Sequence, residues 1–162
     1  YKPPDWNLIG DARSALPNAI AALGTNDQNT LLVVGLNTLG RNSLLDSGAS
    51  SGASRSSGNA GSNSDSLAAH AAATEHALRQ IYENYRPMPQ RHSTVAGLPA
   101  IEQRFRGSLD NVDWSVIVLT FVRDTEVFTI LGMTHADDDL IQIQENVIAK
   151  TIGSLQFAAT TR

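Results

Sequence analysis

Two short stretches carry residue types that could do chemistry. "GASSG", residues 48–52, matches the G-x-S-x-G pattern in which a strand-to-helix turn presents a nucleophilic serine. Ser50 lies in a run of Ser, Gly and Ala with neither element beside it, so we interpret the match as chance. "HADDD", His135 to Asp139, gathers an imidazole and three carboxylates and could form a metal or acid–base site. The competing interpretation is a strand end before an acidic helix start, where the helix dipole favours anions.

The other histidines do not combine into a ligand set. His70 and His76 are six residues apart on an expected helix, about 240° around its axis, so they cannot share a metal. His92 stands alone among polar neighbours, and the chain contains neither cysteine nor an H-E-x-x-H motif. We therefore expect no catalytic residue, no metal and no cofactor. The alternative is an autonomous hydrolase or metal-dependent enzyme that uses the His135–Asp139 cluster.

Arginines in the middle of the chain offer a different chemistry. They would form a basic patch if the end of the expected helix lies over the strand that follows. The alternative is scattered surface charges balanced by Glu83 and Glu102. The arginines concerned are Arg79, Arg86, Arg91, Arg104 and Arg106.

Composition excludes several classes of function. The net charge of −4 and the pI of about 5.4 argue against nucleic acid or an anionic membrane surface as the main partner. The longest apolar runs, such as residues 116–122, are strand-sized, so we expect no transmembrane segment. Because the chain begins at Tyr1 and not at Met, we expect a processed form or an excised piece.

One segment differs in composition from the rest. Residues 47–66 are mostly Ser, Gly and Ala and offer almost nothing to bury, which predicts a flexible loop. The 46 residues before it are too few to carry a core of their own. We therefore expect one domain over residues 1–162 that contains this loop.

The hydrophobic pattern along the chain changes between the periodicity of strands and that of helices, and these elements must position any site. Strand-like patterns precede the loop at 5–10, 19–24 and 30–39. Helical spacing follows, with N-cap candidates at 64–66 and a stop at Pro87. The apolar positions of this helix are Leu67, Ala71, Thr74, Leu78, Ile81, Tyr82 and Tyr85.

Four further strands and a closing helix complete the chain. The strands are expected at 91–96, 100–106, 113–123 and 127–134. In the second of these, Phe105 faces one way while Arg104 and Arg106 face the other. The closing helix begins near Asp137 to Asp139, ends at Gly153 and carries an apolar stripe. Its stripe is Leu140, Ile141, Val147, Ile148, Ile152 and Leu155.

This order of elements predicts the fold class. Hairpin-connected strands with two long helices indicate an α+β protein, with a mostly antiparallel sheet covered by helices on both faces. Trp6 and Trp114 are expected to anchor its core.

Four stretches carry a resemblance to a known family. They are "PPDWNL", "VAGLPAIEQRFRG", "WSVIVLTFV" and "TIGSLQF". Together they resemble the PsbP-like α/β/α sandwich. The resemblance implies that Val95, Gly97 and Pro99 form a corner leading into the meander, with Gly97 in a conformation that L-residues avoid. The alternative is a ligand-gripping loop.

A narrower resemblance concerns the parent protein. The ending at Ser154 to Phe157 is similar to a module that follows the peptidase domain in bacterial HtpX/Ste24p-type zinc metallopeptidases of the cell envelope. Free-standing members of the fold group include DcrB-like envelope lipoproteins and type VI secretion adaptors, which bind protein partners. The resemblance implies a noncatalytic accessory module in the cell envelope or periplasm.

The expected binding region is the helix-to-strand corner. Apolar sheet faces are consumed by the core, which leaves strand edges for a protein or peptide partner. We therefore predict docking between residues 82 and 106, and not at the acidic helix start. The residues expected to bind are Tyr82, Tyr85, Met88, Arg91, Arg104 and Arg106.

Overall fold

A computed structural model describes residues 2–38, 61–137, 139 and 141–157. Strands β1 (Trp6–Leu8), β2 (Ala19–Thr25) and β3 (Thr30–Thr38) come first, followed by helix α1 (Gly61–Ile81). Strands β4 (Glu83–Pro87), β5 (Arg91–Val95), β6 (Leu98–Leu109), β7 (Val112–Arg123) and β8 (Glu126–His135) lead to helix α2 (Ile141–Gly153).

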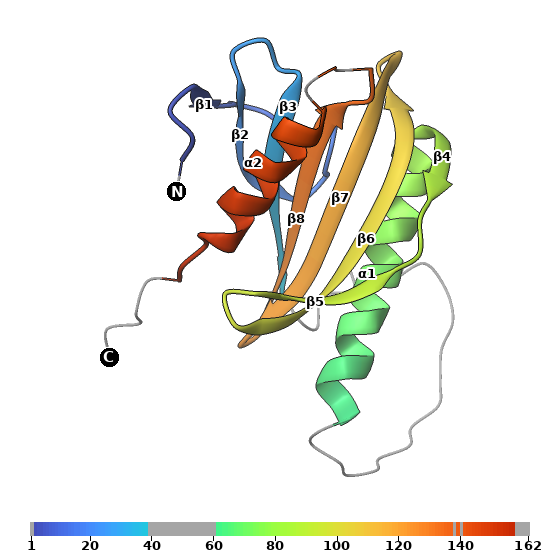
Figure 1. Ribbon diagram of the computed structural model, residues 1–162. Helices are drawn as coiled ribbons and strands as arrows, with labels where there is room; N and C mark the ends of the chain where they lie inside the picture. The colour runs from blue at the N-terminus through green and yellow to red at the C-terminus, as the bar shows by residue number, and fades with distance from the viewer. Residues whose placement is uncertain (1, 39–60, 138, 140, 158–162) are drawn as a thin grey trace.

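The strands form one antiparallel sheet in the order β1-β2-β3-β8-β7-β6-β4. Strand β4 pairs with residues 105–108 of β6, and β5 pairs with residues 98–102 of the same strand. Between them, the backbone N–H of Met88 donates to the carbonyl of Arg104 at 2.8 Å. Strands β4 and β5 are therefore two halves of one sheet edge, and β1 lies at the opposite edge (Figure 1).

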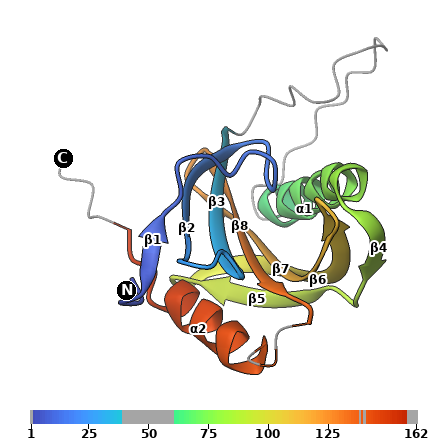
Figure 2. The same cartoon turned by 90° about the horizontal axis from the view of Figure 1, so that it is seen from above.

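The helices lie on opposite sides of the sheet, which confirms the predicted α+β class (Figure 2). We call these sides the α1 face and the α2 face. Side chains of β7 alternate between them: Val116 and Val118 join the core under α1, while Leu119 and Phe121 join the core under α2. Trp6 and Trp114 are buried in the α2 and α1 cores, as expected.

The middle helix differs from its predicted boundaries at both ends. It begins at Gly61, so Ser64, Asp65 and Ser66 lie inside α1 and do not cap it. Leu67 and Ala71 pack on Ile101. This tertiary contact stabilises the first turns of the helix even though they consist largely of polar residues. Residues 47–60 of the predicted flexible loop lie outside the described residues, and the single-domain expectation stays a prediction.

The helix also ends before Pro87, at Ile81. Asn84 has a φ of 52°, the left-handed conformation that ends helices, and the chain then pairs with β6 as strand β4. Tyr85 therefore belongs to a strand and not to the helix. The sequence pattern missed β4 because a five-residue polar strand shows no alternation of its own.

The predicted corner is a two-residue hairpin turn. Val95 pairs with Leu98, and the residues between them, Ala96 and Gly97, have φ values of 50° and 79°. Two consecutive positive φ angles are typical of a type I′ turn, whose twist matches the strands it joins. The corner is architectural, and Ala96 shares the left-handed conformation that was expected at Gly97 alone.

Candidate functional site

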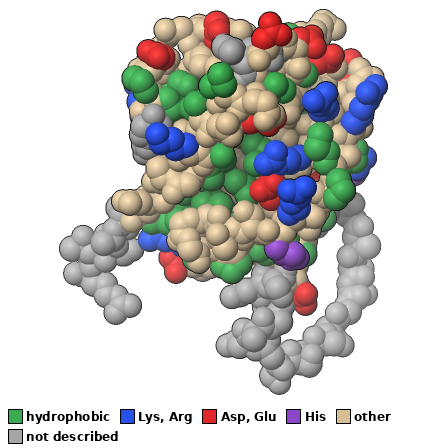
Figure 3. All heavy atoms as spheres, in the orientation of Figure 1, with side chains coloured by type: hydrophobic (Ala, Val, Ile, Leu, Met, Phe, Trp, Pro, Cys, Tyr) green, Lys and Arg blue, Asp and Glu red, His purple; other side chains and the backbone are tan. Residues whose placement is uncertain are grey.

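The two sides of β6 have different chemistry. Phe105 is fully buried on the α1 face, whereas Arg104 and Arg106 are exposed on the α2 face. Antiparallel partners share a face, so Arg86, opposite Arg106, and Arg91, opposite Glu102, join them there. Most Lys and Arg side chains in Figure 3 gather over β4 to β6, beside a hollow with a hydrophobic floor. We call Arg86, Met88, Arg91, Arg104 and Arg106 the arginine edge.

Little on this surface neutralises the arginines. Arg104 Nε pairs with Glu102 Oε1 at 2.8 Å. Within the described ranges, Arg86, Arg91 and Arg106 form no ion pair. Met88 lies beside them with 44% of its surface exposed, which is high for a large apolar side chain. The arginine edge therefore presents unpaired positive charge next to an apolar contact.

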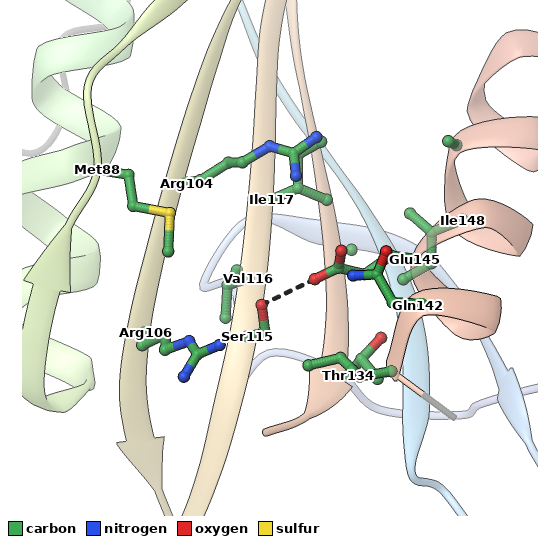
Figure 4. Close-up of a pocket in the computed structure, with 13 residues that line it drawn as sticks. Met88, Arg104, Arg106, Ser115, Val116, Ile117, Thr134, Gln142, Glu145 and Ile148 are labelled. Carbon is green, nitrogen blue, oxygen red and sulfur yellow. Dashed lines mark hydrogen bonds between the residues drawn. The ribbon is translucent and has the colours of Figure 1, made fainter. Parts of the chain in front are cut away.

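A groove of about 260 Å³ separates the arginine edge from α2. Its floor is made by β7 and β8, and α2 forms the far wall (Figure 4). The hydroxyl of Ser115 donates to Glu145 Oε1 at 3.1 Å and links the floor to that wall. The side of the groove formed by Arg104 and Arg106 stays basic. The groove is lined by Met88, Arg104, Arg106, Ser115, Val116, Ile117, Gly132, Thr134, Ile141, Gln142, Glu145, Ile148 and Ala149.

A row of polar side chains crosses the sheet at one end of this groove. Strand register places Thr30 opposite Thr134, Thr134 opposite Ser115, Ser115 opposite Arg106, and Arg106 opposite Arg86. Thr30 and Thr134 are fully buried, and the Oγ1 atom of each lacks a hydrogen-bond partner among the described residues. An unpaired buried hydroxyl is costly, and at 0% exposure neither of these two is within reach of a ligand in the groove.

The two tyrosines predicted to bind lie on the other face. Tyr82 is 2% exposed, stands edge-on to Phe105 and directs its hydroxyl to the Sδ atom of Met133 at 3.4 Å. Tyr85 stacks on Phe105 with ring centroids 4.3 Å apart. The structure thus brings Met88, Arg91, Arg104 and Arg106 together on the α2 face and places both tyrosines in or beside the α1 core.

Burial changes the acidity of both tyrosines. It raises the pKa of the Tyr82 phenol well above its ordinary value. Burial, assisted by the carboxylate of Glu75 and opposed by Arg79, raises the pKa of Tyr85 to about 12. Arg79 lies over the Tyr85 ring at 4.7 Å and pairs with Glu75 at 2.7 Å, so it does not belong to the arginine edge.

The alternative site at His135 to Asp139 shows no assembled geometry in its described members. The His135 ring stands edge-on to Trp114 with centroids 4.4 Å apart. Asp137 and Asp139 are exposed, and Asp138 lies outside the described residues. His76 contacts Gln80 through its Nε2 atom at 3.2 Å. In the described part of the chain, no group of three or more His, Asp or Glu side chains could hold a metal ion.

Sequence reasoning missed the α2 side of the groove. Gln142 and Glu145 fall within the closing helix but outside its apolar stripe, and Ser115 and Thr134 fall within two of the expected strands; none of the four was predicted to bind. The acidic helix start was treated as remote from the arginines, yet the first turns of α2 lie across the groove from Arg104 and Arg106. A signal was present: Ser115 and Thr134 are hydroxyl residues in strands otherwise rich in large apolar side chains.

Comparisons with known proteins place the fold. No family model and no curated protein sequence matches the chain. The solution structure of cyanobacterial PsbP (CyanoP) from Synechocystis is similar, with a TM-score of 0.54 and 12% identity over 91% of this chain and 81% of that chain. PA94, a putative regulator from Pseudomonas aeruginosa, gives 0.55 and 12% over 99% and 88%.

A third similar structure is LpqN from Mycobacterium tuberculosis, described as involved in cell envelope biogenesis. Its TM-score is 0.54, with 13% identity over 96% of this chain and 79% of that chain. At such identities the similarity is one of fold. It supports the resemblance drawn from the sequence motifs and gives no support to the narrower metallopeptidase resemblance. The chain therefore has a PsbP-like α+β fold.

Proposed function

We propose that this chain is a noncatalytic protein-interaction module whose partner docks on the arginine edge. The observation that carries the proposal is four exposed arginines on one face of an open sheet edge, three of them without an ion pair in the described structure. Arg and Met are enriched at protein interfaces, and an open edge offers backbone groups to an incoming segment.

The test is differential capture from the envelope fraction of the producing cells. The wild-type chain is compared with the double variant Arg91→Glu, Arg106→Glu and with Arg13→Glu, an exposed arginine near the opposite sheet edge. We expect proteins that wild type and Arg13→Glu retain and the double variant loses. Identical captured sets from all three would contradict the proposal. Every substituted side chain is exposed, so we expect all variants to fold like the wild type. An unchanged melting temperature for each variant verifies this.

Catalysis by the isolated chain is the competing function. We expect no turnover of ester or peptide substrates. Turnover that disappears on His135→Ala or Ser50→Ala would overturn the noncatalytic proposal and favour the hydrolase alternative.

The proposed setting is the cell envelope. Support comes from the fold it shares with LpqN, and fractionation of the producing cells tests it. No helix in the described ranges is long and apolar enough to cross a membrane. A finer hypothesis is that the parent is a zinc metallopeptidase with this chain as its C-terminal module. An H-E-x-x-H motif encoded upstream of Tyr1 would support that parentage, and a lipoprotein signal there would contradict it.

A further inference from the structure

The groove beside the arginine edge is too small for most whole ligands. Sites for small molecules and cofactors usually enclose about 300–1,000 Å³. At about 260 Å³ this groove is below that range. Lys and Arg side chains border the hollow in Figure 3. Its size suits a single side chain presented by a partner that rests on the edge.

Donors exceed acceptors on the basic side of the groove. Arg106 carries five N–H donors and has no ion-pair partner in the described structure, and Arg104 spends its Nε on Glu102. On the opposite wall, the Glu145 carboxylate already accepts from Ser115. What this side lacks is an acceptor, and a carboxylate supplies two oxygens able to accept from two N–H groups of one guanidinium.

Apolar surface lies on both sides of these donors. Ile117 forms the floor beside Arg104, Met88 stands over the near rim, and Ile148 projects from α2 (Figure 4). A matching segment would therefore carry aliphatic residues on either side of its charge. A chain of mobile Glu residues alone would leave these apolar contacts unused.

We propose that the groove is a carboxylate subsite that receives one acidic side chain, flanked by aliphatic residues, from the protein partner. Its carboxylate pairs with Arg106 and Arg104, on the side of the groove away from Glu145. This inference rests on the proposed docking function and names the partner chemistry that the arginine edge selects. It involves no covalent step.

The probe is the blocked pentapeptide acetyl-Ala-Leu-Glu-Leu-Ala-amide, titrated into the isotope-labelled full chain and followed by backbone amide NMR shifts. We expect shifts confined to the groove strands and the first turns of α2. Replacing the peptide's Glu by Gln should weaken binding about tenfold, the ratio expected for loss of a charge-assisted hydrogen bond. Equal binding of the Gln peptide, or shifts located elsewhere, would overturn the proposal.

Protein variants test the individual donors. Arg106→Gln should weaken the Glu peptide about tenfold, and the matched charge control Arg13→Gln should leave it unchanged. Arg104→Gln removes the second guanidinium and should weaken binding about threefold, since its Nε already pairs with Glu102. Both side chains are exposed, so unchanged melting temperatures verify folding, and unchanged affinity in both Arg106→Gln and Arg104→Gln would refute the subsite.

The subsite and the docking function fail in different ways. A captured partner that is lost with the double variant but is still bound by Arg104→Gln and by Arg106→Gln would refute the subsite and leave the docking function standing. The opposite result is also informative. If the peptide binds in the groove but no captured protein depends on the arginine edge, the docking function is refuted. A protein side chain is then refuted as the occupant of the groove as well.

Discussion

The two faces of β6 show how one strand can serve both a core and a binding surface. On the α1 face, Phe105 is sealed by Tyr82 and Tyr85, and the 21-residue helix α1 packs over this half of the sheet. On the α2 face, the 13-residue helix α2 packs mainly on β8 and leaves the arginines of β6 uncovered. The comparison indicates that the candidate binding surface lies where the sheet is no longer covered by a helix.

The strongest test of this contrast compares adjacent residues of one strand. Phe105→Ala should lower the free energy of unfolding by about 3–5 kcal/mol, because it leaves a cavity among fully buried side chains. Arg104→Ala should change it by about 0.5 kcal/mol or less, since its ion pair with Glu102 is exposed. Urea denaturation measures both. Comparable losses would show that the α2 face of β6 is also structural.

The next effect concerns how closely α2 approaches the sheet. A Cβ atom on Gly132 would lie 2.6 Å from Cγ2 of Ile148 and 2.9 Å from Cγ2 of Ile117. Gly132→Ala should therefore cost about 1–3 kcal/mol by overpacking. Gly153→Ala is the matched control, because nothing lies within 4 Å of its added Cβ. Equal melting temperatures for the two variants would contradict the close approach of α2 to the sheet.

A smaller effect is expected at the hairpin turn between β5 and β6. Gly97→Ala forces an L-residue to a φ of 79° and should cost about 1 kcal/mol, whereas Ala96→Gly relieves such strain and should cost less or stabilise. Melting temperatures of the two variants check the order. The reverse order would mean that the turn does not have the type I′ conformation.

The smallest effect is a pH dependence specific to the α1 face. The folded pKa of Tyr85, about 12, is above its ordinary value of about 10, so its contribution is complete below about pH 10. That contribution is lost as the pH rises towards about 12, because the unfolded phenol ionises first. Tyr85→Phe should flatten this decline, as measured by denaturation at increasing alkaline pH. An unchanged decline would assign it to other groups.

Patterns confined to one element were predictable. The alternation of β6, the helical spacing of Leu67, Ala71 and Leu78, and the end of α2 at Gly153 are confirmed, because each depends on the period of a single element. The predicted end of the first helix, at Pro87, was wrong, because α1 ends at Ile81. Its position depends on β4 finding a partner in β6, a contact between segments about twenty residues apart.

The candidate site was predictable only in part. Met88, Arg91, Arg104 and Arg106 were placed correctly beside one another, since hairpin neighbours follow from local order. Tyr82 and Tyr85 were assigned to the same surface because closeness in sequence says nothing about the side of the sheet. Glu145 and Thr134 belong to elements whose distance from the arginines cannot be read along the chain.

The amino-acid sequence by itself determined that Arg104 and Arg106 oppose Phe105, because side chains alternate along any strand with a period of two. It also determined the two amphipathic helices and a sharp corner at Gly97. Only the tertiary structure decided that α2 stops short of β6 and leaves a groove between them. The position of this groove depends on the close approach of α2 to the sheet at Gly132. It also depends on the register that aligns β3, β8, β7 and β6.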